Sequence, residues 1–217
     1  MLLSALLSNS KYSKKSIIEK LVMHRVKLSK EELFTRHTLE IPEEDVQWIQ
    51  DWYYQITTDH RPIEHVIWYC EFAWHRFHVT WDTLIPRPET EYMIEAVVER
   101  VQQNEETRKK SEESAKDSSI RSEWQVTLLD IGTWCGVLGL STLLHAGNHI
   151  WMSIFTDLSS KALDVAKMNY QMLKPQIRNQ KSEIQFLECS LMDHEVIREV
   201  FGKQKSPLAP LWERGES

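Results

Sequence analysis

Glycine is scarce in this chain and tryptophan is unusually common. Among 217 residues there are 6 glycines and 9 tryptophans, whereas glycine ordinarily makes up about 7% of a globular protein. No apolar run is long enough to span a membrane, and the leading Met-Leu-Leu-Ser-Ala-Leu-Leu lacks the basic start and cleavage site of a signal peptide. Hydrophobic residues (41%) and charged residues (27%) occur at ordinary levels, which excludes collagen-like, coiled-coil and disordered chains.

Cysteine is also rare, and its pattern indicates no special chemistry. Cys70, Cys135 and Cys189 are an odd number of thiols without a Cys-x-x-Cys pair, which argues against a disulfide framework or a zinc site. Four histidines lie close together without a metal-ligand spacing: His60, His65, His75 and His78. The net charge is −6 and the pI is about 5.9, so the overall field does not favour nucleic acid or anionic membranes. We therefore expect a metal-free cytoplasmic monomer with reduced thiols.

The first part of the chain has a helical pattern. Apolar residues recur at three- and four-residue spacing up to about residue 60. Pro42, followed by the acidic residues 43–45, is a favourable helix start. Apolar and polar residues then alternate, which is typical of a hairpin. The sequence predicts a helical domain over 1–75 and a hairpin linker over 76–90.

The remaining residues, 91–217, have an α/β pattern. Short apolar runs at 126–131, 150–156 and 184–187 are typical of strands buried on both faces of a parallel sheet, with helical segments between them. This order predicts half of a doubly wound nucleotide-binding sheet. An insert at 102–123 is rich in Glu, Lys, Ser and Asn; it is either a solvated helix extension or a disordered segment.

A glycine-containing loop follows the first of these strands. Residues 130–139 read Asp-Ile-Gly-Thr-Trp-Cys-Gly-Val-Leu-Gly, and Asp157 ends the second strand. Glycines at such a turn let the backbone approach a ligand, and the acidic residue is placed to accept both ribose hydroxyls. A dinucleotide would need Gly-x-Gly-x-x-Gly for its pyrophosphate. Because S-adenosylmethionine has no phosphate and an ammonium group that Asp130 could hold directly or through water, the pattern favours this methyl donor.

Longer motifs carry a specific family resemblance. The run Leu84-Ile85-Pro86-Arg87-Pro88-Glu89-Thr90-Glu91, together with segments at 61–67, 128–133 and 156–166, closely resembles the release factor glutamine methyltransferases over residues 40–193. The resemblance implies an N-terminal helical domain plus a Rossmann-like class I methyltransferase domain, which is truncated here. It also implies transfer of a methyl group from S-adenosylmethionine to the side-chain nitrogen of the glutamine in the Gly-Gly-Gln tip of peptide chain release factors. The release factor would dock on the helical domain.

The resemblance also assigns residues to the site. The cofactor loop would comprise Gly132, Thr133, Trp134, Cys135 and Gly136. Asp157 would bind the ribose, and Leu191 would lie near the adenine. Three residues are assigned to a substrate-side loop: Arg87, Glu89 and Thr90. These three also fit a rigid double-proline turn in which Thr90 caps the following helix, and the two interpretations can both hold.

The family's Asn-Pro-Pro-Tyr motif, which positions the glutamine amide, has no counterpart here. No Pro-Pro occurs in the chain, and the resemblance stops after Phe201. No catalytic residue is therefore assigned, and the strand at 127–131 would be left as an apolar edge. We expect this chain to bind the cofactor poorly, to aggregate and not to methylate. Two alternatives are another S-adenosylmethionine-dependent amino-group methyltransferase and a non-catalytic remnant that binds a release factor.

Three tryptophans occupy positions where the family pattern has glycine. They are Trp68, Trp74 and Trp134, and at position 134 an indole would lie where the backbone must approach the methyl donor. Our hypothesis is that one codon, read as glycine in the source organism, has been translated here as tryptophan. Trp81 and Trp151 are weaker candidates for the same replacement, with aromatic core packing as the alternative.

Overall fold

The chain forms two compact units, Met1–Cys70 and Glu71–Ser217, which are described separately. The computed structural model describes residues 1–114, 126–177 and 182–190. Leu191 and the part of the charged insert from residue 115 onward therefore lie outside the described residues. No helix of the described part of the chain is both long enough and apolar enough to cross a membrane.

The first unit is helical, as its periodicity predicts. Its helices are α1 (Leu3–Ser8), α2 (Lys15–Val26), α3 (Lys30–Thr35), α4 (Glu43–Thr58) and α5 (Ile63–Ile67). Pro42 is the N-cap of α4, and three acidic side chains follow in the first turn, where they face the positive end of the helix dipole. Buried side chains of α2 and α4 form the centre of the core: Ile18, Leu21, Val22, Ile49 and Tyr53.

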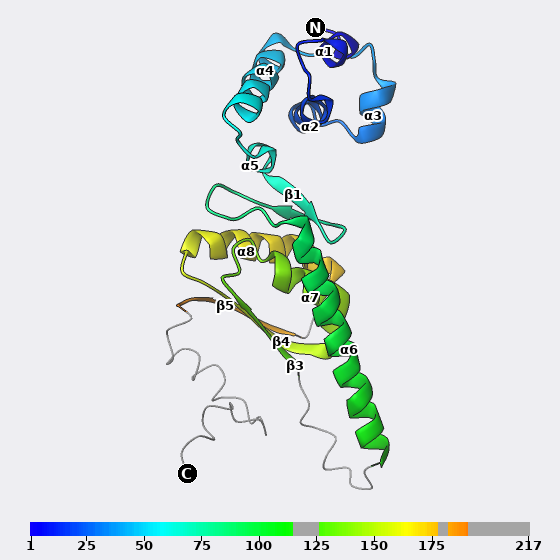
Figure 1. Cartoon of the computed structure of the whole chain (residues 1–217), viewed down its shortest axis with the longest axis vertical. Helices are drawn as coiled ribbons and strands as arrows, with labels where there is room; N and C mark the ends of the chain where they lie inside the picture. The colour runs from blue at the N-terminus through cyan, green and yellow to red at the C-terminus, as the bar shows by residue number, and fades with distance from the viewer. Residues whose placement is uncertain (115–125, 178–181, 191–217) are drawn as a thin grey trace. The chain divides into compact units, whose positions relative to one another are not determined.

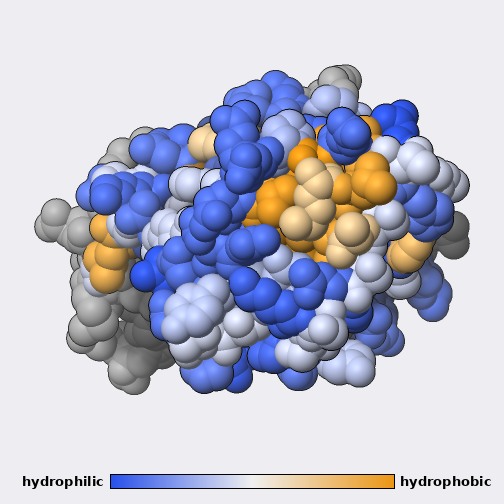
Figure 2. Space-filling model, turned by 90° about the horizontal axis from the view of Figure 1, so that it is seen from above, coloured by the Kyte–Doolittle hydropathy of each residue, from blue (hydrophilic) through white to orange (hydrophobic). Residues whose placement is uncertain are grey.

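Apolar side chains also remain at the surface of the first unit. Met1, Leu2 and Phe34 are 50%, 44% and 51% exposed. Figure 2 shows apolar side chains gathered on one face of the molecule. Exposed apolar patches of this kind are common at protein interaction sites.

A short hairpin lies at a different place from the one that the sequence predicts. Strands β1 (Tyr69–Phe72) and β2 (His75–His78) form a two-stranded sheet, whereas the alternation suggested 76–90. Residues 79–87 form no strand, because Thr80 and Thr83 close a turn: the Thr83 amide donates to the Thr80 carbonyl at 3.1 Å, and the Thr80 amide donates to Thr83 Oγ1 at 3.0 Å. The division between the units falls at residue 70, five residues before the expected end of the helical domain.

The second unit contains a parallel sheet, which confirms the α/β fold class. Its strands are β3 (Val126–Ile131), β4 (Ile150–Asp157) and β5 (Glu183–Glu188), in the order β3-β4-β5. Helices α7 (Val137–Ala146) and α8 (Ser160–Leu173) connect these strands, contact each other and lie on the same side of the sheet (Figure 1). Among the described residues β3 has one neighbour, β4, so the strand that leads into the glycine-containing loop is an edge strand.

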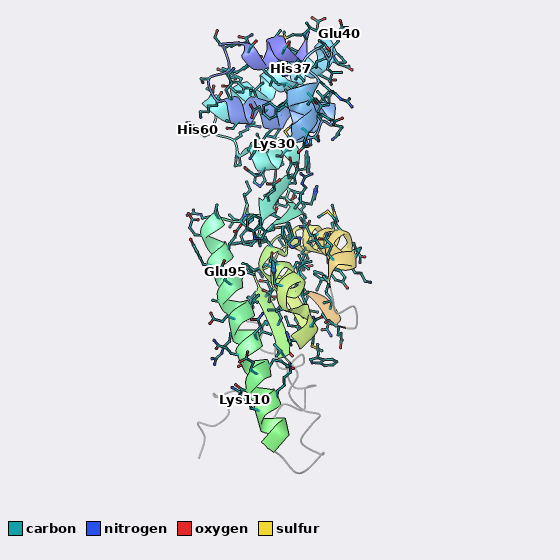
Figure 3. All side chains as sticks on the ribbon, turned by 90° about the vertical axis from the view of Figure 1, so that its right-hand side faces the viewer. Lys30, His37, Glu40, His60, Glu95 and Lys110 are labelled. Atoms are coloured by element: carbon teal, nitrogen blue, oxygen red, sulfur yellow. The ribbon has the colours of Figure 1, made fainter. Side chains whose placement is uncertain are left out.

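Helix α6 (Glu91–Ser114) precedes the sheet and packs against α7. Its first half is anchored by Ile94 and Val101, which are buried. Figure 3 shows Glu95 in this half and Lys110 towards the other end of the helix. The side chains described between residues 102 and 110 are mostly exposed, which makes this part of α6 a solvated helix extension, one of the two forms expected for the insert.

Candidate cofactor site

The loop at residues 132–136 joins the carboxyl end of β3 to the start of α7. Because β3 and β4 are parallel and in register, with Asp130 opposite Phe155 and Ile131 opposite Thr156, their carboxyl ends meet at one edge of the sheet. This edge is where ligands bind in open α/β sheets. The structure therefore brings Asp130, the loop and Asp157 together, and both carboxylates accept hydrogen bonds from the loop.

Every second residue of the loop has a left-handed backbone conformation. Gly132, Trp134 and Gly136 have φ values of 66°, 48° and 80°, and the residues between them do not have positive φ. The Gly136 amide donates to the Thr133 carbonyl at 2.7 Å, and the Thr133 amide donates to the Thr156 carbonyl at 2.9 Å. These two hydrogen bonds fix the loop to itself and to β4.

The buried side chain of Asp130 holds the loop by accepting hydrogen bonds. One of its carboxylate oxygens, Oδ2, accepts the Thr133 hydroxyl at 2.7 Å and the Gly139 amide at 3.0 Å. The side chain is buried. Burial raises the pKa of Asp130, an effect that the two hydrogen bonds oppose and the nearby charge of Asp157 reinforces. Asp130 thus joins the loop to α7, and binding of an ammonium group by Asp130 stays a prediction.

Asp157 links the end of β4 to the loop and to α8. Its Oδ2 accepts the Trp134 amide at 2.9 Å, and its Oδ1 accepts the Ser159 amide at 2.9 Å. The Ser159 hydroxyl in turn caps α8 by accepting the Ala162 amide at 3.2 Å. Each carboxylate oxygen has a second lone pair, so Asp157 is held in one orientation and retains acceptor capacity for two hydroxyl groups.

Cys135 contributes its backbone and not its thiol to this loop. The side chain is fully buried, and desolvation raises the pKa of the thiol to about 12. The thiol is therefore neutral at physiological pH, when a nucleophile or metal ligand would need to be a thiolate.

Asn169 is a residue that our sequence analysis missed. This fully buried side chain donates from Nδ2 to the carbonyl oxygens of Cys135 and His78, both at 2.8 Å. Its Oδ1 accepts the His78 amide at 2.7 Å. One carboxamide on α8 thereby fastens both the cofactor loop and the end of β2.

The helix periodicity of the sequence could have identified Asn169 as a buried polar residue. Ala162, Ala166 and Asn169 share one face of α8 at the spacing i, i+4, i+7, and the two alanines are buried. A polar residue on a buried face requires hydrogen-bond partners. That position alone marks Asn169 for attention, although it does not identify the partners.

Gly139 has a steric role that our sequence analysis did not assign. A Cβ added there would lie 2.4 Å from Cε1 of Phe155 and 2.9 Å from Oδ2 of Asp130. Only glycine therefore lets α7 approach β4 this closely. Gly132 differs, because an added Cβ would meet nothing within 4 Å, so this part of the loop borders open space.

The residues expected on the substrate side lie in one turn. Arg87 precedes a short 3-10 helix, η1 (Pro88–Thr90), that leads into α6, and the Thr90 amide donates to the Arg87 carbonyl at 2.9 Å. Arg87 and Glu89 are exposed. The rigid turn is present, and α6 begins at Glu91, which places Thr90 directly before the helix at the N-cap position. Among the described residues no hydrogen bond joins this turn to the cofactor loop, and a role in substrate binding stays a prediction.

No metal centre is found in the described part of the chain, where no group of three or more His, Cys, Asp or Glu side chains could hold an ion. His75 does lie near His145, with ring centroids 5.7 Å apart. Desolvation, followed by the charge of His145, lowers the pKa of His75. Two rings in this arrangement are a packed pair and not a ligand set.

Comparison with known proteins identifies relatives of the chain. No protein-family model matches it. It is 34% identical over 134 residues to the release factor glutamine methyltransferase of Enterococcus faecalis, covering 62% of this chain and 40% of that protein. It is 30% identical over 148 residues to the protein of the same name from Streptococcus pneumoniae, covering 68% and 44%.

A third relative agrees with these two. The release factor glutamine methyltransferase of Clostridium acetobutylicum is 30% identical over 139 residues, covering 64% of this chain and 41% of that protein. The aligned part of the chain thus spans about two fifths of the length of these relatives. The parallel sheet, the loop after its first strand and these relatives lead to one assignment: the chain belongs to the release factor glutamine methyltransferase family.

Proposed function

We propose that the second unit binds S-adenosylmethionine at the loop 132–136, for transfer of a methyl group to the glutamine of the Gly-Gly-Gln tip of a release factor. The observation that carries this proposal is the position of Asp157. Its carboxylate lies at the carboxyl end of β4 and is fixed to the loop through the Trp134 amide. This is where a doubly wound sheet holds the ribose of a nucleotide-like ligand.

The residues of the site fit the donor groups of this cofactor. Asp157 retains one lone pair on each carboxylate oxygen beyond those used by Trp134 and Ser159, which matches a pair of ribose hydroxyls. Gly132 borders open space, so the backbone there can approach a ligand closely. S-adenosylmethionine supplies a methyl group on a positively charged sulfur, and the task of these residues is to hold and orient it.

The chain does not supply a recognisable group for the second substrate. The lone pair of an amide nitrogen is delocalised into its carbonyl, so a glutamine side chain needs to be held and oriented for attack. The family motif for this task, Asn-Pro-Pro-Tyr, has no match in the sequence. We therefore propose that this chain alone does not methylate.

The first unit is our candidate for docking the release factor. It is separate from the sheet unit and exposes Met1, Leu2 and Phe34. If this chain binds a release factor without binding S-adenosylmethionine, the non-catalytic remnant becomes the better description.

The test is equilibrium dialysis with radiolabelled S-adenosylmethionine. We expect no measurable binding to the chain as it stands, measurable binding to the Trp134→Gly variant, and loss of that binding when Asp157→Ala is added. Tight binding by the unaltered chain would contradict our expectation that the indole at position 134 lies where the backbone must approach the cofactor. Equal binding with and without Asp157 would overturn the assigned site.

A further inference from the structure

Three tryptophans adopt a backbone conformation that tryptophan rarely takes. The φ angles of Trp68, Trp74 and Trp134 are 65°, 67° and 48°. In this left-handed region the Cβ atom crowds the backbone, and apart from glycine mainly Asn, Asp and His are found there. The four other tryptophans that the structure describes do not have positive φ: Trp48, Trp52, Trp81 and Trp151.

Trp68 occupies the end of a helix. It is the C-cap of α5, with φ 65° and ψ 20°. A helix that ends in the left-handed conformation most often does so at a glycine, which has no Cβ. The local geometry at position 68 therefore favours glycine.

Trp74 occupies the tight turn of the hairpin. Ala73 and Trp74 are the two residues between β1 and β2, and both have positive φ, 45° and 67°. A two-residue hairpin loop with positive φ at both positions is a type I′ turn, whose second residue is typically glycine. The turn geometry of the hairpin thus favours glycine at position 74. This reason is independent of the helix end that favours glycine at position 68.

Trp134 occupies the cofactor loop. It lies between Gly132 and Gly136, and these three residues are the left-handed positions of the loop. Glycine occupies the first and the third, so position 134 is the exception. Its backbone amide still donates to Asp157, an interaction that needs no side chain.

The indoles at these three positions are exposed. Trp68, Trp74 and Trp134 are 47%, 95% and 44% exposed. By contrast, Trp48 and Trp52 lie in α4, pack against the core of the first unit and place their rings 6.1 Å apart. The structure therefore separates Trp48 and Trp52, which pack against a core, from the three tryptophans at turns that favour glycine.

We infer that the natural protein has glycine at positions 68, 74 and 134, and that the three tryptophans come from reading one codon by the wrong genetic code. The codon UGA is read as tryptophan in some codes and as glycine in others, so a single misreading accounts for all three sites at once. Trp81 and Trp151 keep their identity, because the backbone at these positions does not require glycine. For position 134 the inference also deepens the proposed function, since the indole is then removed from the cofactor loop.

Stability measurements test the structural part of this inference. Trp68→Gly, Trp74→Gly and Trp134→Gly are made singly in the full chain, with Trp48→Gly and Trp52→Gly as controls in α4. In urea denaturation we expect each of the first three to raise the ratio of folded to unfolded protein by about twofold or more, because strain is relieved. The controls should lower that ratio more than tenfold, through glycine in a helix and lost packing. A loss at all three sites as large as in the controls would overturn the inference.

Residue identity is tested independently by mass spectrometry of peptides from the protein in its source organism and by the gene. We expect glycine at the three positions, UGA at codons 68, 74 and 134, and UGG at codons 48 and 52. Tryptophan in those peptides, or UGG at the three codons, would overturn the inference. Neither result depends on cofactor binding, so failure here and failure of the proposed function are distinguishable.

Discussion

The side-chain amide of Asn169 donates to the carbonyl oxygen of Cys135 at 2.8 Å, across 34 residues of sequence. The same carboxamide forms two hydrogen bonds with the backbone of His78, 91 residues away. One side chain on α8 therefore holds both the cofactor loop and the end of β2. Its removal should loosen both together.

We expect Asn169→Ala to lower the free energy of unfolding by about 2 to 4 kcal/mol, because it leaves buried backbone groups of His78 and Cys135 without their partner. Urea denaturation measures this change. Asn148→Ala is the control, since Asn148 is exposed and its replacement should cost less than about 0.5 kcal/mol. Equal effects of the two substitutions would contradict the role given to Asn169.

Asn169→Asp should introduce a dependence of stability on pH. An ionised carboxylate would face the carbonyl oxygens of Cys135 and His78, which repel it, so burial and repulsion raise the pKa of the new group. A carboxyl group whose pKa is raised in the folded state stabilises that state at low pH. This stabilisation is lost as the pH rises through the pKa of the group in the folded state. We expect the variant to be less stable at pH 8 than at pH 5 relative to the original chain. The same difference at both pH values would contradict this.

Gly139→Ala should separate α7 from β4. The added Cβ would lie 2.4 Å from Cε1 of Phe155, and overpacking of this kind typically costs about 1 to 3 kcal/mol. Gly147→Ala is a matched control, because its Cβ would meet Ile177 at 3.6 Å, an ordinary contact. Thermal unfolding of both variants measures the difference, and a similar midpoint for both would show that the close approach is not needed.

The contribution of Asp130 to the free energy of unfolding should depend on pH. Compared with the uncharged variant Asp130→Asn, the original chain should be relatively more stable in acid than at neutral pH. Burial, followed by the charge of Asp157, raises the pKa of Asp130, so the folded state holds this proton more tightly than the unfolded state. That contribution is complete below the unfolded pKa of about 4 and is lost as the pH rises through the raised folded value. We expect the stability of the original chain minus that of Asp130→Asn to fall from pH 4 upward. A difference that increases with pH would contradict this sign.

The thiol of Cys135 should be unreactive in the folded protein. It is buried, and its pKa is raised to about 12, so almost no thiolate forms at pH 8. Cys70 is also buried, whereas Cys189 is partly exposed. A disulfide reagent at pH 8 should therefore give one fast phase, which Cys189→Ser removes. Persistence of a fast phase in that variant would contradict the burial of the other two thiols.

The parallel sheet was accessible from the sequence because strands buried on both faces are continuous apolar runs. The expected runs at 126–131, 150–156 and 184–187 agree with β3, β4 and β5 to within a residue at their ends. The loop and Asp157 were found for a related reason, since the ends of parallel strands meet at one edge. These features depend on residues close together in the sequence.

The features that were missed depend on contacts between distant residues or on an atypical residue. The partners of Asn169 lie 34 and 91 residues away, and no local pattern identifies them. The hairpin was misplaced because its turn is Ala73-Trp74, which lacks the glycine that usually marks such a turn. With glycine at position 74 the strand boundaries would have been recognisable.

The hydrogen bonds that fix the cofactor loop all join residues that are synthesised before β5. The residues that they join lie between His78 and Asn169. Since chains are made from the N-terminus and domains begin to fold during synthesis, every partner of the loop has been made before β5 emerges. The loop can therefore take its final form on the two strands β3 and β4, before β5 is added to the sheet.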